Sequence, residues 1–119
     1  MILIKPNVLF LIASDPRLSP KPAEAVRIAA GVGVWQKVEV SIYLRGVAVL
    51  ALSEHPAGLV DEENFARYLP LAADWGRAIY VQRGAPLLAG LGKPLLNYAE
   101  IDDVALGVLA ARSASVLCF

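Results

Sequence analysis

Cysteine and histidine are almost absent from this chain, and their scarcity excludes several kinds of chemistry. The single cysteine, Cys118, leaves no pair for an internal disulfide and no set of thiolates for a metal. The lone histidine, His55, stands in a loop rich in proline and glycine, where a solvated surface residue is the simpler interpretation. Walker-type phosphate loops and GxGxxG fingerprints are absent too. We therefore predict no metal and no cofactor.

An excess of charge and a long apolar run are also missing. Lysine and arginine total 11, and so do aspartate and glutamate, so no net field attracts nucleic acid or anionic lipid. No apolar run approaches the ~18 residues needed to span a bilayer. Residues 1–7 are too short for a signal-peptide core and lack a small-residue cleavage site. We expect a cytoplasmic protein without a nucleic-acid or membrane partner.

Apolar residues are abundant for the length. The chain has 119 residues, of which 57% are hydrophobic and 18% charged, and we interpret residues 1–119 as a single domain. A small core cannot hide that much apolar surface, which favours burial against other copies of the chain. A parallel sheet covered on both faces would also account for part of it, because its strands are apolar on both sides. Both explanations can hold, and we place the homo-oligomer first.

Strand-like and helix-like segments alternate along the chain. This alternation predicts an α/β fold, with a parallel sheet covered by helices on both faces. We expect strands over 7–14, 38–44, 78–82, 95–98 and 114–119. We expect helices over 22–32, 47–52, 61–76, 86–89 and 102–112.

The pattern of each strand predicts its place in the sheet. Residues 38–44 alternate apolar with polar side chains, which favours a wetter face near an edge or an interface. The apolar run 78–82 is expected at the centre of the sheet. Residues 95–98 form a short strand at best, placed at an edge.

The helices carry their own signals. Asp61 is placed to cap one helix, which Pro70 should kink or split. Asp102 or Asp103 is placed to start the last helix. The face that this last helix turns toward the sheet is expected to consist of Val104, Ala105, Val108 and Leu109.

Polar residues follow the ends of the first three predicted long strands. Open α/β sheets bind ligands at the carboxyl ends of their strands, and Pro86 with Gly84 suits a tight turn into a helix start that attracts anions. Arg17, Arg45 and Arg83 could line the carboxyl edge of the sheet together and hold a phosphate, sulfate or carboxylate. The alternative, which we place first, is that each arginine is a solvated surface residue or forms an ion pair between subunits. The candidate ligand-binding residues are Asp15, Arg17, Arg45, Gly46, Gln82, Arg83 and Gly84.

Cys118 lies between Leu117 and Phe119 in an apolar run. Free cysteines in such runs are usually small core residues without reactivity. We therefore expect Cys118 to be buried. A sulfur-carrying role would require this end of the strand to be exposed.

Three segments together resemble the DsrE/DsrF-like (TusD- and YchN-like) family. The strand that ends in Ser14–Arg17 and its alanine-rich helix resemble the family's opening. Residues 42–47 resemble its aromatic-rich strand with an Asp-Gly-Val turn, although Arg45 replaces the acidic residue before Gly46. Residues 81–91 are similar to the strand end that carries a cysteine, followed by an alanine-rich helix.

This resemblance implies a three-layer α/β/α fold with a five-stranded, mainly parallel sheet, assembled as a trimer or hexamer. It also implies a persulfide on the family's cysteine, but Gln82 stands at that position. Because an amide cannot form a persulfide, we expect a binding or scaffold role without sulfur chemistry of its own. The alternatives are a sulfurtransferase subunit, which uses Cys118 or the cysteine of a sulfur-relay partner, and a binder of small anions.

Overall fold

One sheet organises the molecule. The computed structural model describes residues 5–54, 57–74 and 77–119, and five parallel strands form its sheet in the order β4-β3-β2-β1-β5. The strands are β1 (Asn7–Ile12), β2 (Glu39–Leu44), β3 (Ile79–Gln82), β4 (Ala99–Ile101) and β5 (Ser115–Cys118). The predicted α/β class and parallel sheet are confirmed.

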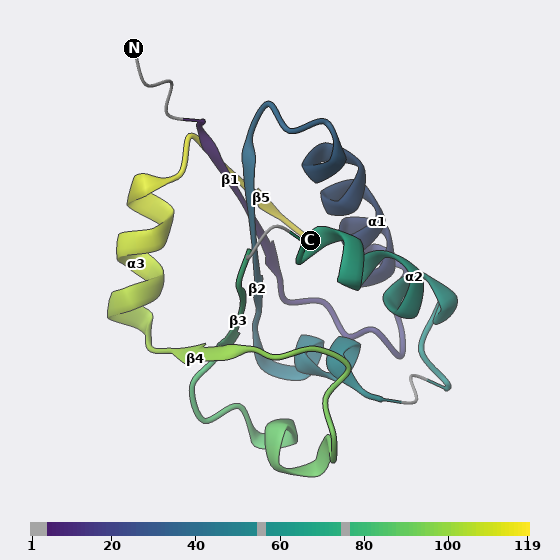
Figure 1. Ribbon diagram of the computed structural model, residues 1–119. Coiled ribbons are helices and arrows are strands. Elements are labelled where there is room, and N and C mark those ends of the chain that lie inside the picture. The colour runs from purple at the N-terminus through teal and green to yellow at the C-terminus, as the bar shows by residue number, and fades with distance from the viewer. Residues whose placement is uncertain (1–4, 55–56, 75–76) are drawn as a thin grey trace.

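Helices cover the two faces of the sheet unequally. In Figure 1, α1 and α2 lie on one face, α3 lies on the other, and the short helix η1 lies near the carboxyl edge. The α-helices are α1 (Lys21–Val34), α2 (Glu63–Ala72) and α3 (Asp103–Arg112), and the 3₁₀ helices are η1 (Gly46–Leu52) and η2 (Pro86–Gly90). The predicted three-layer arrangement is confirmed. None of the helices in the described ranges has the length and hydropathy required to cross a membrane.

The main core lies between the sheet and the α1/α2 layer. Alternate side chains of the strands, such as Phe10, Ile42 and Val81, are buried on this side, since successive residues of a strand point to opposite faces. From α2, the buried residues Phe65 and Leu69 complete the core. The small buried residues of α1 are Ala23, Ala25, Ala29 and Ala30.

The predicted strand positions are partly wrong. β2 is the middle strand rather than a strand near an edge, and β3 lies one place from the edge. The alternation in β2 misled because its polar positions are covered: Tyr43 is fully buried, and the Ser41 hydroxyl donates to Asn7 Oδ1 at 3.0 Å. β4 is the predicted edge strand, but it begins at Ala99. The Leu95 amide instead donates to the carbonyl of Leu52 at 2.7 Å, which holds the preceding segment against η1.

The predicted cap of α2 is wrong. Glu62 rather than Asp61 stands at the cap position, and no side-chain hydrogen bond caps the helix. Pro70 does not split α2, which continues to Ala72. Only the last turn follows Pro70, and the buried Leu69 beside it holds this end of the helix against the core. Asp102, by contrast, caps α3 as predicted, since its Oδ1 accepts from the Ala105 amide at 2.8 Å.

The orientation of α3 agrees in part with the predicted one. Val104 is 77% exposed and does not face the sheet, whereas Leu109 is half-buried. Ala105, Val108 and Leu109 line a hollow together with Tyr80 of β3. The sheet face under α3 is therefore covered by one helix that has no fully buried residue.

Candidate functional site at the carboxyl edge of the sheet

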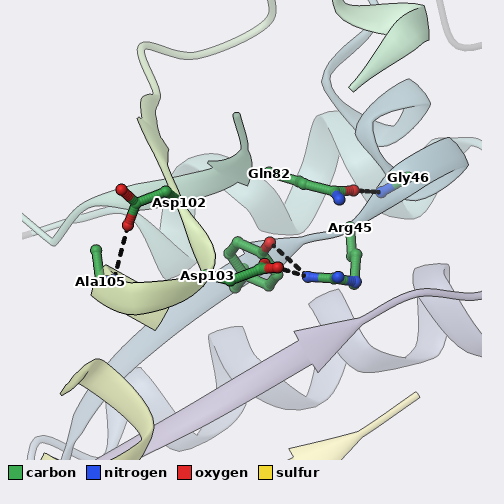
Figure 2. A network of polar contacts seen from close by, with 7 residues as sticks. Arg45, Gly46, Gln82, Asp102, Asp103 and Ala105 are labelled. Carbon is green, nitrogen blue, oxygen red and sulfur yellow. Dashed lines mark hydrogen bonds and ion pairs between the residues drawn. The ribbon is translucent and has the colours of Figure 1, made fainter. Parts of the chain in front are cut away.

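The ends of β2 and β3 meet at the candidate site. The two strands are parallel, with Leu44 opposite Val81, so the residues that follow them lie side by side. Gln82 Oε1 accepts a hydrogen bond from the Gly46 amide at 2.9 Å (Figure 2). Gly46 starts η1 with a φ of 57°, and the first amides of a helix have no partner within it. Gln82 therefore satisfies the start of η1, which is a structural role.

Two carboxylates at the start of α3 lie beside the arginines that follow β2 and β3. Arg45 Nη1 donates to Asp103 Oδ1 at 3.1 Å and to the Tyr43 hydroxyl at 3.2 Å. The hydrogen bond that Arg45 donates to Asp103, followed by the one that it donates to Tyr43, raises the pKa of the Arg45 guanidinium above its usual value. Arg83 Nη1 lies 3.7 Å from Asp102 Oδ2. The two arginines are thus each beside a carboxylate of α3.

A shallow pocket of about 190 Å³ lies between these elements. It is lined by Gln82, Arg83, Ile101, Asp102 and Asp103. The lining carries two carboxylates and one guanidinium, so its net charge is negative. An anion entering this pocket would have to compete with Asp102 and Asp103 for the arginines.

The remaining predicted residues lie nearby without joining this network. Arg17 binds Asp15 through two hydrogen bonds, Nε–Oδ1 at 3.0 Å and Nη2–Oδ2 at 2.8 Å. The Gly84 amide points to Glu100 Oε1 at 3.5 Å, and the φ of Gly84 is 72°. Each predicted arginine therefore contacts a carboxylate of its own chain, and the expected ion pairs between subunits stay a prediction.

Asp102 and Asp103 are the site residues that sequence reasoning missed, because helix capping explained them fully. A usable signal was present. Both follow β4 directly, so they reach the same edge of the parallel sheet as Arg45 and Arg83, where opposite charges on neighbouring strand ends come together.

Cys118 is exposed, and the prediction that it is buried is wrong. Its strand, β5, is an edge strand, with Cys118 opposite Leu11 of β1. β1 and β2 separate it from β3, at roughly 4.8 Å per strand. The thiol is therefore at the same edge as Gln82 but several strands away. His55 lies outside the described residues, and the described ranges contain no cluster of His, Cys, Asp and Glu that could hold a metal.

Replacing Asp15 with asparagine is expected to remove a pH-dependent part of the stability. The Arg17 hydrogen bonds lower the pKa of the Asp15 carboxyl from 3.8. A carboxyl with a depressed folded-state pKa stabilises the fold above its unfolded pKa and loses that effect as the pH falls through the folded value. The stability difference between Asp15→Asn and the parent should be present at neutral pH and vanish at low pH, as urea unfolding at several pH values would measure. A constant difference would contradict the assignment.

Replacing Gln82 with leucine is expected to lower the free energy of unfolding by about 1–2 kcal/mol, because the Gly46 amide loses its acceptor. Gln82→Glu, which keeps an acceptor oxygen, is the matched control. Urea unfolding measures the stability, and hydrogen exchange reads the Gly46 amide directly. Unchanged protection of that amide in Gln82→Leu would show that the hydrogen bond does not form in solution.

A solved structure has the same fold as this chain. No protein-family model matches the chain, and no curated protein matches it. Among solved structures, the crystal structure of the ychN protein from E. coli superimposes with a TM-score of 0.79. The match covers 96% of this chain and 99% of that chain, at 15% sequence identity. The chain therefore has the YchN fold, with a five-stranded parallel sheet between helical layers.

Proposed function

We propose that this chain is a DsrE-like homo-oligomeric protein that binds or scaffolds partners and has no persulfide chemistry of its own at β3. The observation that carries this proposal is the state of Gln82. It stands at the strand end where the resemblance places a sulfur-carrying cysteine, and its side chain is used to hold the Gly46 amide at 2.9 Å. A glutamine in that position supplies a structural contact and no nucleophile.

The charges around Gln82 support a binding role over a catalytic one. Ion pairs connect Arg45 and Arg83 to the start of α3, and exposed pairs of this kind contribute little stability. They can therefore be exchanged for the charged groups of a partner at small cost. The same exchange keeps the anion-binding alternative open, since a phosphate or sulfate could replace Asp102 or Asp103 beside the arginines.

A second candidate function is favoured by the exposure of Cys118. An exposed thiol at the carboxyl edge could accept sulfur from a relay partner as a persulfide, in which the thiolate attacks the donor's outer sulfur and the donor thiolate leaves. Sulfur-carrying cysteines lie beside cations, at helix starts or beside metals. None of the side-chain hydrogen bonds among the described residues involves the Cys118 thiol.

Alkylation kinetics separate the two candidates. The proposal expects iodoacetamide to modify Cys118 at the rate of a cysteine in an unstructured peptide, with intact-mass spectrometry as the readout and Cys118→Ser as the blank. A rate tenfold or more above that of the peptide at neutral pH would indicate an activated thiolate and would favour the sulfurtransferase.

A further inference from the structure

The two edges of the sheet differ in how they are protected. β5 forms one edge and pairs only with β1 among the described strands. All its residues are exposed. An edge strand presents a row of unpaired amides and carbonyls, which proteins usually shield with charges, proline, bulges or very short strands. None of the residues from 113 to 119 is charged or proline.

The opposite edge, β4, carries the usual protection. Glu100 is at the centre of this strand, and Asp102 and Asp103 follow immediately. An approaching strand would meet several carboxylates there. The two edge strands have similar lengths, 3 residues in β4 and 4 in β5, but one edge is acidic while the other is apolar and uncharged.

The side chains of β5 are apolar on both faces of the sheet. Val116 is opposite Leu9, and Leu117 is opposite Phe10, so the two point to opposite faces. Val116 is 40% and Leu117 41% exposed. A bound strand would cover both side chains and satisfy the backbone, whereas a bound helix would leave the amides unpaired.

We propose that β5 is an oligomer contact, at which it pairs antiparallel with β5 of a second copy. This proposal rests on the homo-oligomer of the proposed function and names one of its interfaces. An uncharged strand meets no repulsion from its own copy, and the chain has a formal net charge of +0, so two whole molecules do not repel one another either. A two-fold axis makes the contact self-complementary. Three such pairs can belong to one hexamer.

The two-fold axis makes a geometric prediction about single residues. The axis is normal to the continuous sheet and passes midway between the two copies of one β5 residue, since opposite residues in an antiparallel pair point to the same face. That position faces its own copy at a Cα separation of about 4.5–5.5 Å, within the range of a disulfide. Its neighbours in sequence meet different residues of the partner.

The test compares Val116→Lys with Val104→Lys by size-exclusion chromatography with light scattering over a range of concentrations. Val104 is 77% exposed on α3, outside β5, so it controls for the added charge. We expect the parent and Val104→Lys to share one oligomeric state and Val116→Lys to form smaller species, with circular dichroism showing all three folded. An oligomer that survives Val116→Lys would overturn the β5 contact and leave the homo-oligomer standing, whereas a monomeric parent would overturn both. Equal dissociation of both variants would also overturn the assignment to β5.

Single-cysteine variants give a second measurement that does not depend on weakening the contact. In a Cys118→Ser background, cysteine is placed in turn at 115, 116 and 117, and the parent supplies Cys118 itself as the fourth position. Oxidation with a mild oxidant reports the covalent dimer, and we expect one of the four positions to cross-link at least severalfold more than the other three. Equal, slow cross-linking at all four would overturn the pairing. The sulfur chemistry is tested separately, by the alkylation of Cys118 in the parent.

Discussion

Replacing Tyr43 with alanine is expected to lower the free energy of unfolding by about 3–5 kcal/mol, the range for truncating large aromatic side chains in a core. Tyr43 is fully buried in the middle strand, on the face that α3 covers. Its hydroxyl accepts from Arg45 Nη1 at 3.2 Å, and Arg45 in turn binds Asp103 of α3. The truncation therefore opens a cavity and also removes a support of the candidate site.

Tyr43→Phe separates these two effects. It keeps the ring and removes only the hydroxyl, so the loss in stability should be about 1 kcal/mol, one ordinary hydrogen bond. Urea or thermal unfolding of both variants measures the difference. A small loss in Tyr43→Ala would mean that α3 does not cover this face in solution.

Replacing Phe10 with alanine is expected to destabilise the protein by a similar amount, about 3–5 kcal/mol. Phe10 is fully buried in β1 and stacks on Phe119, with ring centroids 5.8 Å apart and planes 9° apart. Stacked rings add about 0.5–1.5 kcal/mol beyond their burial. The pair joins β1 to the residue that follows β5, so its loss should also loosen the edge strand.

Phe119→Leu is the companion variant for this pair. It removes the stacking but keeps apolar volume, so global stability should fall by only about 1 kcal/mol. The amides of β5 should nevertheless exchange faster in Phe119→Leu than in the parent, whereas those of β2 should not change. Unfolding curves and hydrogen exchange together measure the two effects. Equal protection of β5 in the parent and in Phe119→Leu would contradict a role for the stacked rings in holding the edge.

The sequence predicted the class and layers of the fold because hydrophobic periodicity reports local structure directly. It identified the long strands and the cap of α3. The order of strands was less accessible, since the alternation in 39–44 depends on contacts distant in sequence. Ser41 binds Asn7 across the sheet, and Tyr43 is covered by a helix that begins 60 residues later. Such contacts leave no trace in the local pattern.

The candidate site, too, could be predicted only in part from the sequence. Position at the carboxyl ends of parallel strands brought Arg45, Gly46, Gln82 and Arg83 together as expected. The partner of each arginine was not predictable, because a carboxylate at a helix start is equally well explained as a cap. Cys118 was misplaced because an apolar run predicts burial only if the strand is covered, and β5 is an uncovered edge.

The central proposal is that no side chain of this protein accepts sulfur at the carboxyl edge of the sheet. The most direct measurement is intact-mass spectrometry of the parent and of Cys118→Ser after incubation with a persulfidated donor protein and blocking of free thiols. We predict that neither protein gains the mass of a sulfur atom. Addition of one sulfur atom to the parent, and not to Cys118→Ser, would contradict it.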